Sequence, residues 1–358
     1  MTDAKTITPP QSLSAATQRQ EWIDCLRGYT MLLVITGHCD LYLTGWFSGF
    51  SMLSNVYQLP LFFFISGYFA YSSKLSSGNM NAISGAVRKR IRMVLWPTLV
   101  MLTMYYCCFL SGNYSIADIA SDQYKGGYWF TIVAVEIYVL ALPFILFLNI
   151  GMLRLRWACA IIAVAMLVFA KAGNALSDLL WTHDFIGWLS LHFVFSYMPY
   201  FLLGIMMRLL LPMLVVRVNT LRLPLVTVVI CLVALCYMPT LRYGAFDWRV
   251  MPLLCVLVVS LLLTFRGLRG TLNTSTAMGR LLSVIGRNTL PIYLLHYFIL
   301  SLLALAAGDA FAGVNSGGGV WRLPITAGVA VAVALCCIGA YRLMATIRIR
   351  KYIFPGRG

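Results

Sequence analysis

The chain has 358 residues, of which 61% are hydrophobic and only 11% are charged, whereas soluble domains have roughly 25% charged residues. A soluble protein of this composition would lack a polar surface. Apolar runs of about 17 to 22 residues recur along nearly the whole chain, and each is long enough to cross a bilayer core as a helix. Strands of a membrane barrel would give short alternating segments, which the sequence lacks. We therefore predict an all-α integral membrane protein.

The apolar runs predict a bundle of about ten transmembrane helices. We place them at residues 26–45, 55–72, 92–110, 128–149, 157–173, 193–211, 223–240, 250–266, 288–308 and 323–345. The segments between them are too short for a second domain. We expect a disordered cytoplasmic tail at 1–20, one membrane domain at 21–346 and a basic cytoplasmic tail at 347–358. Residues 78–92 look interfacial and end in a basic cluster where the third span begins.

The net charge of +16 follows the expected topology. If the first residues are cytoplasmic, the inner segments hold 22 of the 27 Lys and Arg residues and the outer segments hold five. The five outer residues are Lys125, Lys171, Arg242, Arg249 and Arg322. This asymmetry is what the positive-inside rule predicts, and it places both termini in the cytoplasm. Because the topology accounts for the basic charge, we do not expect nucleic acid as a partner.

Ionisable side chains inside a membrane span are costly, so each is a candidate functional residue. Arg27 lies at the cytoplasmic end of the first span, and His38 follows eleven residues later. Eleven residues make almost three helical turns, so the two side chains share one face, roughly 16 Å apart along the axis. This pair could hold an anionic donor at the inner interface and transfer a proton deeper in. The alternative is an interfacial arginine and a histidine that only joins two helices.

Two further spans carry ionisable residues. Glu136 lies in the fourth span at a depth comparable with His38; its carboxylate could orient a histidine base and stabilise the imidazolium that forms. His296 lies two turns into the ninth span, with Tyr293 one turn before it. For both Glu136 and His296, the alternative is a structural hydrogen bond to a neighbouring helix.

Other polar residues give weaker signals. His183 and His192 lie in or near the outer segment 174–192, where we expect solvent. Ser66 is followed by Gly67, which would let either a ligand or a neighbouring helix approach closely. Most of the ten cysteines lie inside the spans, where they behave as small apolar residues. No metal-ligand spacing occurs, so we expect no metal site.

The sequence resembles the acyltransferase-3 family of integral membrane acyltransferases at these same positions. Arg27 and His38, with ten residues between them, resemble its Arg/Lys-x10-His signature. The other matches, in chain order, are Leu59–Tyr68 to the second-helix motif, Arg88–Arg92 with Pro97 to the third-helix basic motif, and two later blocks at Tyr128–Phe130 and Gly286–His296. The resemblance covers about residues 21 to 345, and the block around Leu59–Tyr68 looks most like the fucose O-acetylase-like branch.

The resemblance implies a multi-pass enzyme of the bacterial cytoplasmic membrane. Such an enzyme moves an acyl group, with acetyl expected, from cytoplasmic acyl-CoA to a hydroxyl of an extracytoplasmic sugar or glycan. Acyl-CoA would be a co-substrate, and we expect no permanently bound cofactor. Besides the two substrates, the expected partners are membrane lipids. Residues 21–346 would form the membrane acyltransferase domain.

The resemblance and the charges together assign candidate site residues. His38, Glu136 and Arg27 are the catalytic candidates. Donor-binding candidates are Arg88, Arg90 and Arg92, with Ser66, Gly67 and Tyr68; the arginines could pair with the phosphates of CoA. Trp129, Tyr293 and His296 are candidates for lining the substrate site. His38 could deprotonate the acceptor hydroxyl or carry the acyl group itself.

A polytopic transporter of a glycan or lipid-linked sugar is the main alternative. About ten helices with polar residues near the membrane centre also fit that class. Internal repeats with broken helices would favour it, and none is visible in the sequence. A third alternative, a non-catalytic partner in an envelope assembly, would leave Arg27 and His38 unexplained.

Overall fold

A computed structural model describes residues 20–45, 47–71, 80–149, 155–176, 179, 187–217, 221–238, 248–316 and 322–355. The described residues are almost entirely helical and include no β-strand, as the sequence predicts. Of the predicted N-terminal tail only residue 20 lies within the described part of the chain.

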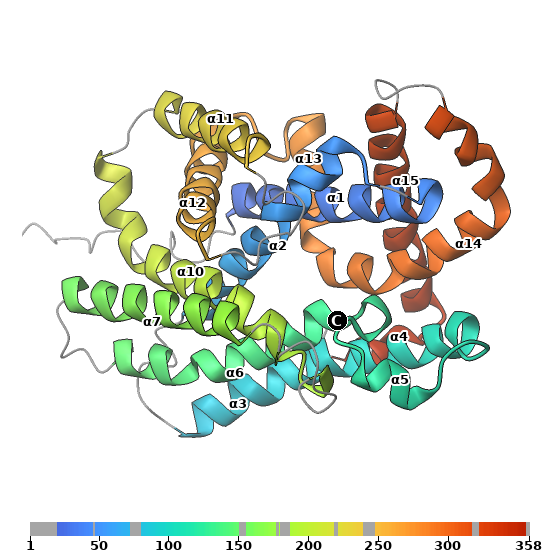
Figure 1. Cartoon of the computed structure of the whole chain (residues 1–358), viewed down its shortest axis with the longest axis horizontal. Coiled ribbons are helices and arrows are strands. Elements are labelled where there is room, and N and C mark those ends of the chain that lie inside the picture. Colours follow the sequence, from blue (N-terminus) through green and yellow to red (C-terminus); the bar gives the residue numbers. More distant parts are fainter. Residues whose placement is uncertain are drawn as a thin grey trace, which may run out of the picture.

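Helices α1 (Glu21–Thr44) and α2 (Gly49–Ala70) form a central pair that the other helices surround (Figure 1). In chain order the other helices are α3 (Met80–Arg90), the π-helix η3 (Ile91–Leu95), α4 (Trp96–Tyr105), the π-helix η4 (Tyr106–Leu110), α5 (Ile116–Ser121), the 3-10 helix η5 (Lys125–Gly127), α6 (Trp129–Asn149), α7 (Leu155–Ala175), α10 (Leu191–Arg217), α11 (Arg222–Cys236), α12 (Met251–Gly267), the 3-10 helix η8 (Leu268–Gly270), α13 (Ala277–Arg287), α14 (Thr289–Ser316), α15 (Arg322–Thr346) and α16 (Arg350–Ile353).

Seven helical segments in the described part of the chain are long and apolar enough to cross a membrane. They are Asn81–Leu110, Trp129–Leu146, Trp157–Ala175, Leu191–Leu211, Met251–Gly270, Thr289–Ala307 and Arg322–Thr346. Together with the family assigned below, they indicate a multi-pass membrane protein. The other three predicted spans coincide with α1, which carries charged residues, with α2, whose first half holds Ser, Asn and Gln residues, and with α11, which has only 15 residues. The count of ten therefore stays a prediction.

The third span differs from its prediction at the inner end. Its helix begins at Met80 and runs through α3, η3, α4 and η4 to Leu110. The basic residues from Arg88 to Arg92 therefore lie within one long helix, and their position at the membrane interface stays a prediction. Basic residues lower the hydropathy of α3 without interrupting its backbone hydrogen bonding. A start of the helix that is predicted from composition therefore falls too late in the sequence.

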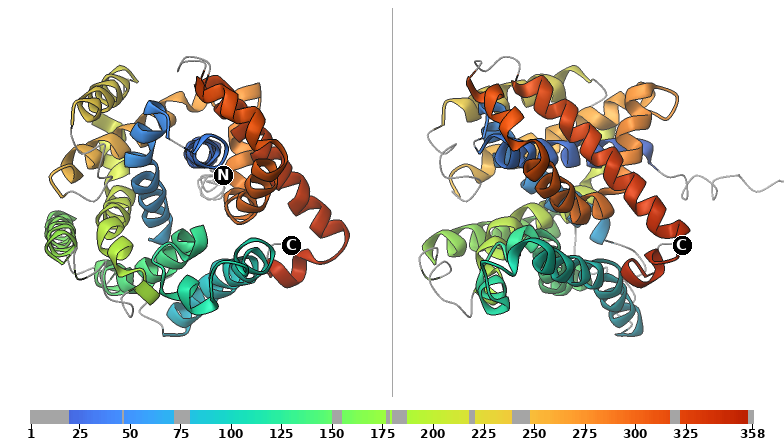
Figure 2. Two further views of the ribbon diagram at one scale, coloured as in Figure 1. Left: turned by 45° about the vertical axis from the view of Figure 1, so that its right-hand side comes forward. Right: turned by 90° about the vertical axis from the view of Figure 1, so that its right-hand side faces the viewer.

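Helix α1 lies at the centre of the molecule, and Figure 2 shows it end-on with the other helices around it. It packs against α2, α12, α13, α14 and α15. Its crossing with α13 is very close, because a Cβ atom added at Gly28 would overlap the Leu282 carbonyl and one added at Gly286 would overlap the Asp24 carbonyl. Small residues at such crossings let helix backbones approach in membranes.

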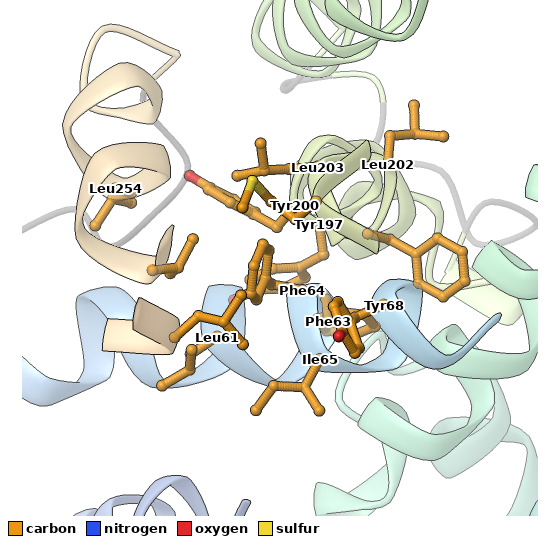
Figure 3. Packing of buried hydrophobic residues seen from close by; sticks show 14 of the residues in the cluster. Leu61, Phe63, Phe64, Ile65, Tyr68, Tyr197, Tyr200, Leu202, Leu203 and Leu254 are labelled. Carbon is orange, nitrogen blue, oxygen red and sulfur yellow. The ribbon is translucent and has the colours of Figure 1, made fainter. Parts of the chain in front are cut away.

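Helix α2 packs closely against α10 in the same manner. A Cβ atom at Gly67 would overlap the Phe201 carbonyl, and one at Gly204 would overlap the Phe64 carbonyl. Figure 3 shows the large side chains that fill the rest of this contact, among them Phe63, which stacks on Tyr197 at a ring-centroid distance of 4.7 Å. The two glycine crossings fix α1 and α2 relative to the surrounding helices.

The contacts also keep the predicted inner and outer groups apart. At one end of α1, the carboxylate of Asp24 pairs at 3.5 Å with Arg287, one of the basic residues counted as inner. At the other end, Asp40 pairs with Arg322 at 3.5 Å, and Arg322 was predicted to be outside. The arrangement agrees with the predicted division of charge, while the cytoplasmic position of the termini stays a prediction.

Candidate active site

A cavity of about 720 Å³ lies between α1, α2, α3, α6 and α14. This volume lies within the roughly 300–1,000 Å³ typical of small-molecule and cofactor sites. Most of its wall is apolar, with Met31, Val34, Phe62 and Phe130 among the lining residues. The cavity can therefore enclose an extended ligand with an apolar portion.

Three cations line this cavity: Arg27, Lys89 and Arg90. No Asp or Glu is among the lining residues in the described part of the chain. Arg27 lies 3.5 Å from the Thr289 hydroxyl, and the Arg90 guanidinium lies 4.1 Å from the centroid of the Tyr138 ring. Fixed guanidinium groups without a carboxylate among the lining residues favour a polyanionic ligand.

Arg90 stands directly before the π-helix η3, and two residues of that π-helix, Met93 and Val94, also line the cavity. A π-helix shifts the angular position of side chains, and short π segments are frequent at functional sites. The irregular segment thus lets the basic turn and the apolar turn that follows face the same cavity.

The cavity follows the face of α1 that leads to His38. Its lining residues Arg27, Met31 and Val34 are spaced three to four positions apart, and His38 is the next residue in that series. His38 itself is half-buried and lies one turn beyond the lining residues. The structure thus brings the predicted Arg27–His38 face to one cavity, with His38 past its last α1 residue.

The ring of His38 is held by its own helix. Its Nδ1 lies 3.0 Å from the Val34 carbonyl oxygen. A carbonyl oxygen can only accept, so this bond requires the proton on Nδ1 and leaves the lone pair on Nε2. Nε2 in turn lies 3.3 Å from the Tyr297 hydroxyl. The nitrogen able to act as a base or nucleophile is therefore Nε2.

His296 lies beside His38, with 4.9 Å between the ring centroids. It is fully buried, and its Nδ1 lies 2.6 Å from the Tyr293 carbonyl oxygen. Its Nε2 has no hydrogen-bond partner among the described residues. His296 does not line the cavity, but Tyr293 does. The second histidine therefore belongs to the surroundings of His38.

Glu136 does not join this group. The residues of α6 on the cavity wall are Phe130, Thr131, Ala134 and Tyr138. Successive helical residues are about 100° apart, so Glu136, two positions from both Ala134 and Tyr138, points away from the cavity. The structure therefore does not bring Glu136 to His38.

The charged neighbour of Glu136 is Lys125, in the segment before α6. Lys125 is buried, and its Nζ donates to the Asp122 and Gly187 carbonyl oxygens, each at 2.6 Å. Burial lowers the pKa of Lys125, while the carboxylates of Asp122 and Glu136 oppose that shift. The Oε2 atom of Glu136 is buried without a hydrogen-bond partner among the described residues. The alternative of a structural hydrogen bond to a neighbouring helix therefore stays a prediction.

The three donor candidates on α2 face different neighbours. Ser66 lines the cavity. Gly67 lies instead at the crossing with α10, against the Phe201 carbonyl. Tyr68 is buried and accepts a hydrogen bond of 3.1 Å from Arg208 of α10. Only Ser66 is therefore in a position to contact a ligand in the cavity.

The remaining candidates lie outside the cavity wall. Arg88 and Arg92 are exposed and are not among its lining residues, whereas Lys89, which was not a candidate, is. Trp129 is buried and stacks on Phe193 of α10 with 3.9 Å between ring centroids. The donor-binding roles of Arg88 and Arg92 stay predictions.

The expectation that His192 is solvated is wrong. His192 is 4% exposed and lies in the first turn of α10, with its ring edge-on to Phe193. Its position at the edge of the outer segment 174–192 suggested solvent, but this end of α10 is buried. His183 lies outside the described residues.

Sequence reasoning also missed a buried carboxylate. Asp40, two residues after His38, is fully buried and accepts hydrogen bonds from the Ser48 amide at 2.8 Å and from the Ser51 hydroxyl. It also pairs with Arg322, at the start of α15. An acidic residue within a predicted span is itself a signal, and this one joins the ends of three helices beside His38.

Residues 20–341 match a protein family described as an acyltransferase domain. The chain belongs to the acyltransferase-3 family. No curated protein and no solved structure matches it significantly. The matched residues of this acyltransferase include all the helices that form the cavity and the surroundings of His38. The fucose O-acetylase-like branch stays a prediction.

Proposed function

We propose that this membrane acyltransferase moves an acetyl group from cytoplasmic acetyl-CoA to a hydroxyl of an envelope sugar or glycan. The observation that carries the proposal is the cavity, in which three cations at one end are joined by an apolar wall to the face of His38. CoA has the matching chemistry, with phosphates at one end of a flexible arm and the thioester at the other.

The donor would bind with its phosphates against Arg27, Lys89 and Arg90. Charge-assisted hydrogen bonds from guanidinium groups suit phosphate oxygens. The exposed Arg88 and Arg92 would contact the part of the donor that extends beyond the cavity. The acyl end would then lie near two lining residues: Val34, one turn before His38 in α1, and Tyr293 of α14.

His38 would serve as the base through Nε2. The acceptor hydroxyl would give its proton to Nε2 while its oxygen attacks the thioester carbonyl. The C–S bond then breaks, and the CoA thiolate leaves and takes the proton from Nε2. In the covalent variant, Nε2 attacks the carbonyl first and the acyl group passes on from His38. Both routes need the lone pair on Nε2, which the bond to Val34 provides.

The cations in the cavity belong to segments that the positive-inside rule places in the cytoplasm. This supports a donor site that opens to the cytoplasm of a bacterial inner membrane, with both termini on the same side. The acceptor would then reach His38 from the outer side.

Sealed membrane vesicles of both orientations test the activity and the orientation together. Cells carrying the gene and their own envelope glycans supply the vesicles, and acetyl-labelled acetyl-CoA is added outside. We expect alkali-labile label in glycan from inside-out vesicles and none from right-side-out vesicles. Labelling from right-side-out vesicles alone would overturn the orientation. If vesicles that contain folded protein gave no labelled glycan, and glycan crossed the membrane in the absence of acetyl-CoA, the protein would instead be a transporter.

A further inference from the structure

The hydroxyl of Tyr297 lies between two acceptors. It is 3.3 Å from Nε2 of His38 and 2.9 Å from the Gly127 carbonyl oxygen. Tyr297 is buried, and its ring packs on His296 with 4.0 Å between centroids and edge-on to His38 at 5.2 Å. Among the described residues, Tyr297 thus supplies the side-chain hydroxyl that lies within hydrogen-bond distance of Nε2 of His38.

The Gly127 carbonyl does not depend on Tyr297. The Tyr293 hydroxyl already donates to it at 2.7 Å. A carbonyl oxygen has two lone pairs, so it can take one donor or both. Tyr297 has a single proton, which can therefore point to Gly127 or to His38 without leaving the carbonyl unsatisfied.

The backbone is shaped to seat this ring. Gly127 has a φ of 101°, which side-chain-bearing residues rarely adopt, and a Cβ atom there would lie 2.7 Å from the Tyr297 ring. A glycine is thus required both by the backbone conformation and by the close approach of the tyrosine. The position of the hydroxyl is defined by this contact as well as by its hydrogen bonds.

We propose that Tyr297 is a positioning residue for His38, donating its proton to the neutral Nε2 and accepting one from the protonated Nε2. This inference rests on the proposed function. With neutral His38, the hydroxyl proton would point to Nε2 and fix the ring. When the acceptor hydroxyl enters, the Tyr297 hydroxyl would turn its own proton to Gly127, which frees the Nε2 lone pair to take the acceptor's proton. The Tyr297 oxygen would then accept from Nε2–H. That proton is then held until the CoA thiolate takes it.

The surroundings of His38 make this role specific. A histidine that becomes charged away from water needs an acceptor, and Glu136 points away from the cavity. The Nδ1 atom of His296 bonds to the Tyr293 carbonyl, and its Nε2 atom has no hydrogen-bond partner in the described part of the chain. Tyr297 is thus the hydroxyl placed to supply what the sequence had assigned to the glutamate.

Tyr297→Phe removes the hydroxyl and keeps the ring. The matched control is Tyr128→Phe: the Tyr128 ring lies 5.2 Å from that of Tyr297, and its buried hydroxyl donates to the Leu294 carbonyl at 2.9 Å. In inside-out vesicles with labelled acetyl-CoA, we expect Tyr297→Phe to lower kcat about 10- to 100-fold, the range for a lost hydrogen bond to a charged group. The KM for acetyl-CoA should stay within about twofold, because Tyr297 does not line the cavity. Tyr128→Phe should keep the wild-type kcat and KM.

A second measurement does not depend on transfer. The chain has four histidines, so ¹⁵N-histidine NMR of the purified protein gives few signals, and His38→Gln identifies those of His38. Tyr297→Phe should shift the His38 Nε2 signal, and Tyr128→Phe should not. An unchanged Nε2 signal, a wild-type kcat, or equal losses in both variants would overturn the role of Tyr297. If the wild-type protein showed no transfer while Tyr297→Phe still shifted the His38 Nε2 signal, the proposed function alone would be overturned.

Discussion

The central helices and the outer helices of this protein differ in opposite ways from what hydropathy suggests. Helices α1 and α2 fall outside the seven apolar segments and are mostly buried, and α1 carries Arg27, His38 and Asp40. The helical segment Trp157–Ala175, at the periphery of the molecule, is apolar, yet only 22% of it is buried inside the protein. Polar groups at the centre find partners in protein, whereas side chains that face lipid have none. The central helices, which hydropathy alone would rank below the others, therefore carry the residues of the candidate active site.

The largest effect on this comparison should come from His38, the central ionisable residue. His38→Gln keeps some hydrogen bonding but removes the base, so transfer should fall by about 10²- to 10⁴-fold. The measurement is label in alkali-released acetate from inside-out vesicles, normalised to folded protein. Thr36→Val is the control, because the Thr36 hydroxyl bonds to the Leu32 carbonyl one turn earlier and to no other group among the described residues. Wild-type acetylation by His38→Gln would leave His38 with a structural role.

Much of the centre was predictable from the sequence. The eleven-residue spacing placed Arg27 and His38 on one face, and the motifs led to Ser66, Arg90 and Tyr293, which all line the cavity. These inferences need only the geometry of a single helix. The role of Glu136 required knowing which side of α6 faces α1, and a span that is apolar all round does not reveal this.

The partners of His38 could not be predicted for a related reason. Tyr297 meets His38 across 259 positions of sequence, and its place depends on Gly127, in a short segment with positive φ before α6. Asp40 was within reach of the rule that buried charges deserve explanation. Its partner Arg322 had been counted as one of the outer basic residues.

The next effect should separate cations inside the cavity from those beside it. Arg90→Ala removes a guanidinium on the cavity wall, so the KM for acetyl-CoA should rise about 10- to 100-fold, the range for a hydrogen bond to a charged group. Arg92→Ala changes an exposed residue of the same helix and should raise the KM less. Initial rates over a range of acetyl-CoA concentrations give both values.

Equal changes in the two variants would contradict this distinction. If both raised the KM equally, the donor would bind the whole basic turn from outside the cavity. If neither did, the cluster would serve topology alone, as the positive-inside rule permits.

The smallest effect concerns stability and compares a central glycine with an outer one. Gly28→Ala places a methyl group against the Leu282 carbonyl of α13, so the helices must separate. Overpacking costs roughly 1–3 kcal/mol, which exceeds the gain of about 0.5–1 kcal/mol from replacing a helical glycine with alanine. For Gly328→Ala, in α15, no atom of the described residues lies within 4 Å of the new methyl group, so the gain from the substitution remains.

Thermal unfolding of the purified protein in detergent should therefore move in opposite directions for the two variants. Gly28→Ala should lower the midpoint, and Gly328→Ala should raise it slightly. The α1–α13 crossing also holds the Asp24–Arg287 pair, one turn before Arg27, so Gly28→Ala should raise the KM for acetyl-CoA as well. A stabilising Gly28→Ala would mean that α1 and α13 do not pack backbone to backbone, and that the cations of the cavity are held by other contacts.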